Sequence, residues 1–288
     1  MFTFIGISFG LACVFTAYLL DGGSMWVFVN AWTEFVVIIG AAIGMYIGGN
    51  GMAITKQTIS AILHLLKPAK FGKEQYLDLL LMIYKIYSVA RTEGLLALES
   101  HIEDPEKSPI FSENHTFIHN HHATSFFCDT MKVQVTGGTQ PQDLSDMMEQ
   151  DLEVVHSEEM QIPDALQAMA DGMPAIGIVA CVLGVIITMG HIGGEASEIG
   201  LAIGNALVGT FLGVMIAYVV MSPLVKAVSQ RIRQEGQYLT CIRHAIAHGA
   251  RGDPPASSVE FARRNIDPSV RPSFEEVNLA IKERGRVK

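Results

Sequence analysis

Positive charge is missing from the first part of this sequence, where no lysine or arginine precedes Lys56. The chain as a whole is acidic, with a net charge of -9 over 288 residues. Because recognition of a phosphate backbone needs a basic surface, this charge argues against a nucleic-acid-binding protein.

The sequence also has few cysteines, and their spacing matches no known disulfide or metal-binding pattern. Cys13, Cys128, Cys181 and Cys241 form no CxxC pair, so we interpret them as free thiols and expect no disulfides. The sequence also shows no glycine-rich phosphate loop and no evident pair of nucleophile and base. We therefore expect no enzymatic activity, no catalytic residues and no cofactor.

Apolar residues are abundant. The mean hydropathy of +0.32 and the apolar content of 49% are high for a soluble protein, whereas 17% charged residues is too many for a chain made only of membrane spans. The apolar N-terminus lacks a basic segment and an A-x-A cleavage site, which predicts a retained span rather than a signal peptide.

Four apolar runs are long enough to cross a bilayer, which needs about 20 helical residues. They are Phe2–Leu20, Trp32–Gly49, Met173–Gly190 and Ile199–Met221, joined by short connections at 21–30 and 191–198. The pattern predicts an all-α polytopic membrane protein with helical cytoplasmic extensions. We place transmembrane helices at 1–20, 32–49, 171–190 and 199–223, a cytoplasmic helical loop at 50–170 and a cytoplasmic tail at 224–288.

The distribution of basic residues predicts the orientation. All 20 lysines and arginines fall in the long middle segment or in the tail, and neither short connection carries one. The positive-inside rule then puts both polar segments and both chain ends in the cytoplasm.

Ionisable groups are absent from the interior of the spans, since Asp21, Glu34 and Asp171 lie only at their ends. A protein that carries protons on its own side chains normally keeps such a group inside the membrane. The chain therefore either conducts nothing or borrows a titrating group from a partner.

Small residues share one helical face in each of the last two spans. In the third span these are Gly177, Cys181, Gly184 and Thr188, and in the fourth Ala206, Thr210, Gly213 and Ala217. Close packing of helices explains the glycines. The thiol and hydroxyls also suit a surface that receives a partner helix or water, so both interpretations remain open.

Two prolines lie near the predicted cytoplasmic ends of these spans. Pro174 and Pro223 suit helix boundaries, where proline is tolerated. At a conducting interface they could instead be bend points that link the spans to the cytoplasmic helices.

The polar segments read as helices at 54–66, 74–102, 142–170 and 224–249, with loops at about 103–112 and 252–258. The second of these helices has apolar residues on more than one side, which predicts several packing neighbours. The histidine-rich stretch 115-HTFIHNHH-122 fits no zinc signature, so we expect a polar helix or loop there and no metal site.

Arg91 and Glu99 lie eight residues apart in the predicted 74–102 helix, with about 12 Å of rise between them. A solvated charged surface and a docking surface in which the charges set orientation both fit, and Gly94 is a point where the helix can break.

Four segments carry a resemblance to a known family: 91-RTEGLLALE-99, 171-DGMPAIGIVACVLGVIITMG-190, 205-NALVGTFLGVMIAYVVMSP-223 and 259-VEFARRNIDPSVRPSFEEV-277. Over nearly its whole length the chain resembles the A-type stator subunits of the flagellar motor, the MotA and PomA family. It is more distantly similar, in the last two spans, to the ExbB and TolQ proton-channel family.

The resemblance implies a homopentamer of this chain around a dimer of a B-type subunit in the bacterial inner membrane. The B-type subunit would supply the ion-binding aspartate and a peptidoglycan-binding domain. Ion flow would drive rotation, and the cytoplasmic part would act on the rotor switch-complex protein.

Site roles follow from the same resemblance. It assigns Arg91 and Glu99 to the rotor interface, Pro174 and Pro223 to coupling, and Thr210, Cys181 and Tyr218 to the ion pathway. Sodium-type relatives have a threonine at the place of Cys181, and a thiol is a poor sodium ligand, so we expect proton coupling. Two alternatives are an ExbB-like energiser of another envelope machine and a non-conducting membrane scaffold.

Overall fold

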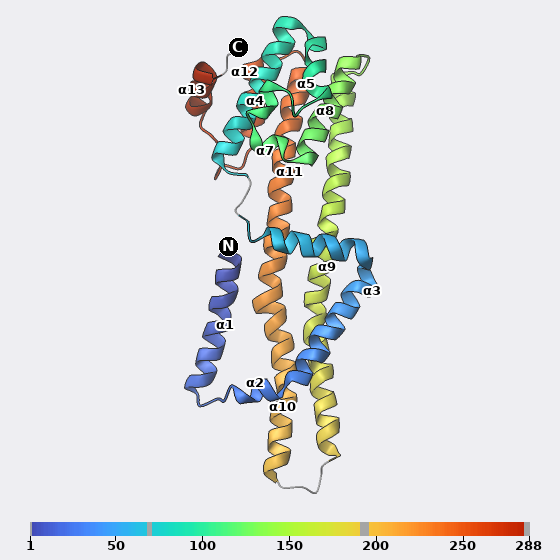
Figure 1. Ribbon diagram of the computed structural model, residues 1–288, viewed down its shortest axis with the longest axis vertical. Helices are drawn as coiled ribbons and strands as arrows, with labels where there is room; N and C mark the ends of the chain where they lie inside the picture. Colours follow the sequence, from blue (N-terminus) through green and yellow to red (C-terminus); the bar gives the residue numbers. More distant parts are fainter. Residues whose placement is uncertain (1, 68–70, 191–195, 285–288) are drawn as a thin grey trace. The chain divides into compact units, whose positions relative to one another are not determined.

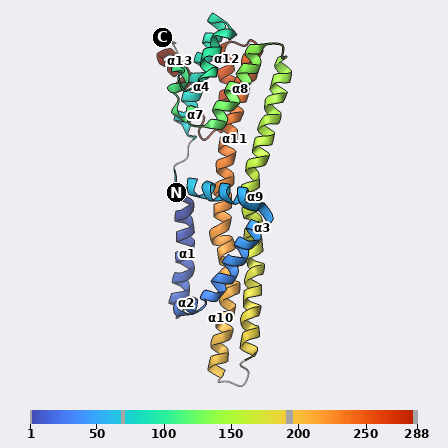
Figure 2. The same ribbon diagram turned by 45° about the vertical axis from the view of Figure 1, so that its right-hand side comes forward.

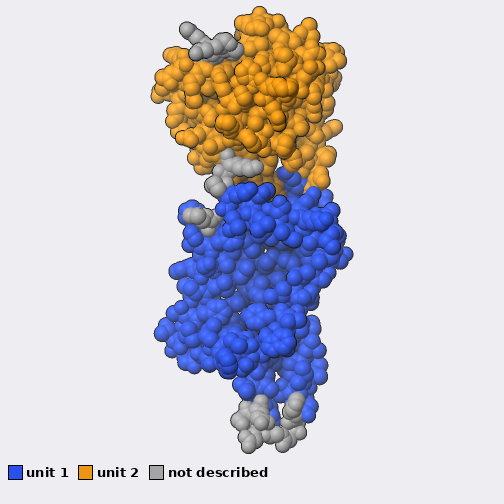
Figure 3. Space-filling view, viewed as in Figure 1, with its two compact units in different colours: residues 1–68, 159–230 blue, residues 69–158, 231–288 orange. Residues whose placement is uncertain are grey.

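The computed structural model describes residues 2–67, 71–190 and 196–284, and these residues form helices without any strand (Figure 1). The predicted all-α fold is confirmed. Contacts divide the chain into two compact units, shown in Figure 3: unit 1 comprises residues 1–68 and 159–230, and unit 2 comprises residues 69–158 and 231–288. Most of the predicted connection at 191–198 lies outside the described residues.

Unit 1 contains the helices that can span a membrane. It is built from α1 (Phe2–Leu20), α2 (Trp26–Asn30), α3 (Trp32–His64), the C-terminal part of α9 (Pro141–Met189), α10 (Ala196–Met215), the π-helix η2 (Ile216–Met221) and the start of α11 (Ser222–Ala250). Within the described residues four helices are long and apolar enough to cross a bilayer, in agreement with the predicted spans. The connection at 21–30, expected as a plain loop, contains the short helix α2.

Helix α3 bends sharply at Gly51, where the predicted span and the predicted 54–66 helix meet (Figures 1 and 2). The Gly51 backbone has φ 72° and ψ 176°, a conformation that only glycine adopts readily. The Tyr46 hydroxyl lies 2.5 Å from Thr58 Oγ1, which itself donates to the Ile54 carbonyl. Tyr46 therefore donates to Thr58 and ties together the two sides of the bend.

The interior of unit 1 is small. Its buried cluster comprises Ala31, Ile38, Ala180, Val208, Leu212 and Met215. Phe28 of α2 packs edge-on against Phe15 of α1, with ring centroids 5.4 Å apart, and also contacts Phe211 of α10. Only 6% of the residues in the apolar stretch of α1 are buried within the chain. Most of the apolar surface of unit 1 is therefore left for lipid or other chains to cover.

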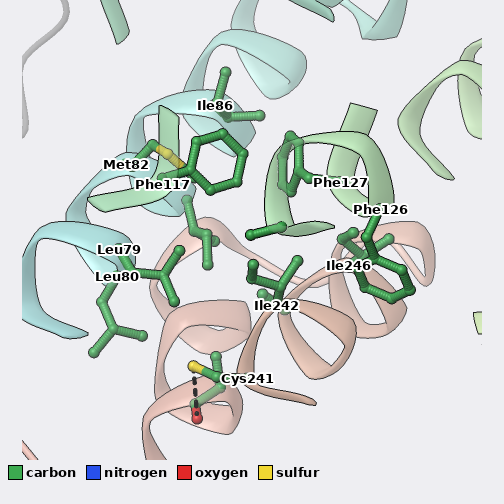
Figure 4. Packing of buried hydrophobic residues seen from close by; sticks show 14 of the residues in the cluster. Leu79, Leu80, Met82, Ile86, Phe117, Phe126, Phe127, Cys241, Ile242 and Ile246 are labelled. Atoms are coloured by element: carbon green, nitrogen blue, oxygen red, sulfur yellow. Dashed lines mark hydrogen bonds between the residues drawn. The ribbon is translucent and has the colours of Figure 1, made fainter. Parts of the chain in front are cut away.

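Unit 2 has the larger core, centred on α4 (Lys73–Glu93). Around α4 lie the 3-10 helix η1 (Leu95–Leu98), α5 (Glu99–Glu103), α6 (Pro109–Ser112), α7 (His115–Ile118), α8 (His121–Thr136), α12 (Pro255–Arg264), α13 (Phe274–Arg284) and parts of α9 and α11. Leu80 and Met82 are both buried, although they are two residues apart and therefore lie on nearly opposite sides of α4. Figure 4 shows Phe117, Phe127 and Ile242 completing this core, which confirms that α4 packs against several neighbours.

Several predicted boundaries in unit 2 were wrong. The expected 74–102 helix ends at Glu93 because Gly94 adopts a φ of 92°. The expected loop at 103–112 includes α6, and the expected loop at 252–258 includes the start of α12 at Pro255. Helices α8 and α13 were not predicted from the sequence.

The histidine-rich stretch forms α7 and the start of α8. Asn114 and Asn120 cap these helices, since their side-chain oxygens accept hydrogen bonds from the backbone nitrogens of Phe117 at 3.0 Å and Ala123 at 3.2 Å. Phe117 is fully buried, so the stretch is partly core rather than only polar surface. Among the described residues no cluster of histidine, cysteine and carboxylate side chains could hold a metal ion.

Candidate ion path and docking surface

Helices α9 and α10 meet along a seam where their backbones touch. A methyl group added at Gly213 would lie 2.7 Å from the Met173 carbonyl oxygen and 2.9 Å from the Gly177 Cα. One added at Gly177 would lie 2.8 Å from the Gly209 carbonyl oxygen. Such approaches are too close for any real Cβ, so these glycines serve helix packing within the chain.

The same seam continues towards the ends of the two helices. A methyl group at Gly184 would lie 2.7 Å from the Ala206 side chain. Thr188 is only 2% exposed, and its hydroxyl donates to the Gly184 carbonyl at 2.8 Å. Thr188 thus belongs to the packed seam and does not offer a free hydroxyl.

Cys181 and Thr210 lie at one level beside the seam. A methyl group on Gly209, the neighbour of Thr210, would lie 3.2 Å from the Cys181 backbone nitrogen. Both residues are partly exposed, and Tyr218 in η2 is 64% exposed. The three assigned pathway residues therefore sit in unit 1 with side chains still accessible, in contrast to Thr188.

Glu34, in the first turn of α3, reaches the same region. Its carboxylate oxygen would lie 3.8 Å from a Cβ at Gly184. From the sequence, Glu34 was predicted only to lie at the end of a span, without a contact to another helix. No signal in the sequence pointed to this contact, because an acidic residue in the first turn of a helix is common whatever that turn faces.

The two assigned prolines differ in their place in the helices, and the boundary interpretation was wrong for Pro174 alone. Pro174 is internal to α9, whereas Pro223 is the second residue of α11, two residues after the end of the π-helix η2, in a first turn that tolerates proline. Proline removes a backbone donor and clashes with the preceding turn. The π-helix η2 therefore stands out, since π turns are rare in helices and frequently occur at functional sites.

Arg91 and Glu99 lie on either side of a turn rather than on one helix. Arg91 is in the last turn of α4, Glu99 begins α5, and both are exposed. Between them Gly94 ends α4, and the Ala97 backbone nitrogen donates to the Gly94 carbonyl at 3.2 Å. The predicted separation along a single helix was therefore wrong, although both charges remain accessible.

The C-terminal motif has a structural role within unit 2. Arg263 donates two hydrogen bonds to Glu260 and a third to the Pro272 carbonyl at 3.0 Å, and Arg271 donates to the Ile266 carbonyl at 2.8 Å. The hydrogen bonds from Arg263 are the main cause that lowers the pKa of Glu260 to about 2. These contacts hold the segment after α12 against that helix.

Comparison with known proteins agrees with this arrangement. Residues 4–94 match the Motility protein A N-terminal family, and residues 119–240 match the MotA/TolQ/ExbB proton channel family. Motility protein A of Escherichia coli strain K12 is 33% identical over 278 residues, covering 96% of this chain and 94% of that relative.

Solved structures of similar fold include the C. jejuni MotAB structure, with a TM-score of 0.75, 19% identity and coverage of 94% of this chain and 98% of that one. The flagellar MotAB stator complex from Bacillus subtilis gives a TM-score of 0.74 at 21% identity, covering 96% of this chain and 98% of that one. Together with the identity over nearly the full length, these findings show that the chain belongs to the motility protein A family.

Proposed function

We propose that this protein is the A-type stator subunit of a bacterial flagellar motor. The observation that carries the proposal is the likeness to Motility protein A along nearly the entire chain, through both span pairs and the polar segment between them. A fold shared with the MotAB structures supports it. In this role the protein converts ion flow into torque and catalyses no reaction.

The partner in this proposal is a B-type subunit that carries the ion-binding aspartate and a peptidoglycan-binding domain, with five copies of this chain surrounding two of the partner. The apolar interior of the spans explains why the acid must come from another chain. Exposed apolar residues on α9 and α10 give such assembly a surface, for example Ile186 at 61% and Leu207 at 58% exposure.

The location follows from the charge distribution. We place the protein in the inner membrane, with both chain ends and the long polar segment in the cytoplasm, because lysine and arginine first occur at Lys56. Arg91 and Glu99 then face the cytoplasm, where they can engage the rotor switch-complex protein.

The site residues divide by role. Thr210, Cys181 and Tyr218 line the ion pathway, and their partial exposure beside a closed glycine seam supports this assignment. Pro174 and Pro223 couple ion passage to motion, and their positions, one inside α9 and the other beside the π-helix η2, make them suitable bend points.

A pair of substitutions tests the function in cells that lack the native gene. We expect Thr210→Val and Arg91→Glu each to abolish swimming while the protein reaches the membrane and co-purifies with its B-type partner. Thr210→Ser and Arg91→Lys, which keep the hydroxyl and the charge, should retain motility. If all four variants swim normally, the protein is a scaffold or energises a different envelope machine.

A further inference from the structure

The turn between α4 and α5 exposes Leu96 and, to a smaller extent, Leu95. Leu96 is 71% exposed, whereas Leu98, two residues later, is fully buried in the core of unit 2. A single exposed leucine is ordinary on a protein surface. Leu96 differs in its setting, because it stands between the exposed charges of Arg91 and Glu99.

The backbone that carries Leu96 is held on both sides. Gly94 adopts a φ of 92° and ends α4, and the Ala97 nitrogen closes the turn onto the Gly94 carbonyl. On the far side Leu98 and Ile102 are buried, and η1 and α5 both pack against α8. The leucine is thus presented in a fixed position, and a partner need not order this loop when it binds.

The two charges alone provide little affinity. Exposed ion pairs are strongly screened and contribute little to binding, although they set orientation and the rate of encounter. Burial of apolar side chains in the core of an interface, inside a polar rim, provides the remainder in typical interfaces. Leu95 and Leu96 are both exposed between Arg91 and Glu99, and Leu96, at 71% against 37% for Leu95, is the one better placed for that role.

We propose that Leu96 is the apolar anchor of this docking surface. It enters an apolar pocket on the rotor switch-complex protein, while Arg91 and Glu99 pair with an acidic and a basic group beside that pocket. This inference rests on the proposed function, since the partner is the rotor.

Substitution at position 96 tests the anchor. In cells that express fluorescently tagged protein, Leu96→Ser should lower the number of chains bound at motors by about tenfold or more. Membrane level and co-purification with the B-type partner should not change. Leu96→Met, which keeps an apolar side chain, should bind like the wild type.

Leu279 of α13 provides the matched control, since it is 56% exposed in the same unit. Leu279→Ser should leave motor occupancy unchanged. The anchor is refuted if Leu96→Ser occupies motors like the wild type, or if both serine variants lose occupancy equally.

If Leu96→Ser lowers the amount of protein in the membrane, photo-crosslinking tests the anchor instead. A photo-crosslinking residue at position 96 should form a covalent product with the rotor protein in swimming cells, and one at position 279 should not. Absence of the product at position 96 refutes the anchor.

Arg91→Glu separates this inference from the proposed function. Loss of occupancy in Arg91→Glu with normal occupancy in Leu96→Ser refutes the anchor and leaves the stator role intact. Normal swimming after deletion of the whole gene refutes the stator role itself.

Discussion

At the residue scale, the missing side chains of a few glycines decide how the membrane unit packs. Gly177 and Gly213 bring the α9 and α10 backbones into direct contact. Gly204 of α10 does not take part in this contact, since a Cβ at that position would meet nothing within 4 Å. The two kinds cannot be told apart by residue type.

This difference gives a matched pair of substitutions. Gly213→Ala should lower the free energy of unfolding by about 1–3 kcal/mol, because the added methyl meets backbone atoms that cannot move aside. Gly204→Ala should be neutral or slightly stabilising, since alanine favours a helix. Thermal unfolding of the purified complex in detergent measures both, and equal melting temperatures for the two variants would contradict the seam.

The glycine pattern shows how far sequence reasoning reaches at this scale. A spacing of three and four residues identified the shared face of each span, because it depends only on helical geometry. It did not reveal that the two faces pack on each other, or that Thr188 is buried while Cys181 and Thr210 remain accessible. Those facts depend on how the two helices pack on each other, which the residue pattern of either helix alone does not show.

At the scale of elements, backbone conformation at single glycines sets where helices turn. Gly51 bends α3 and Gly94 ends α4, both with positive φ. The sequence predicted a change near Gly51 because apolar residues give way to lysine there, whereas the end of α4 was missed because its apolar pattern continues through Leu95 and Leu98. Helix α8 was missed for a related reason, since adjacent Phe126 and Phe127 follow no single-face pattern.

The bend in α3 leads to a second comparison. Gly51→Ala should destabilise the protein by about 1–3 kcal/mol, because a Cβ strains the backbone at a φ of 72°. Gly49→Ala should be tolerated, since a Cβ at Gly49 meets nothing within 4 Å and its backbone is not in the left-handed region. Membrane level and detergent melting temperature should fall for the first variant alone, and a parallel fall in both would show that the bend is not the cause.

At the scale of the whole molecule, the apolar spans determined most of what the sequence could predict. Their length and lack of charge predicted their number and order, and the described part of the chain contains four such helices. How the chains assemble could not be predicted from the sequence. An exposed apolar residue of α9 or α10 is the same residue type whether lipid or a partner chain covers it.

Ion choice also belongs to this scale, since it depends on the assembled channel. A thiol at Cys181 removes one oxygen that sodium would need after it loses its water, so we expect proton coupling. Swimming speed at fixed external pH should stay constant as external sodium is varied. A steep rise of speed with sodium would show that the channel conducts sodium despite the thiol.

The burial of two cysteines in unit 2 has a practical consequence. Burial raises the pKa of Cys128 to about 11 and also raises the pKa of Cys241, so both thiols stay neutral and out of reach of aqueous reagents. The described part of unit 2 should therefore not react with maleimide dyes, even when no cysteine has been replaced. A single cysteine introduced at position 96 would give that unit one reactive thiol, and a fluorophore there would report on the docking turn in an otherwise native chain.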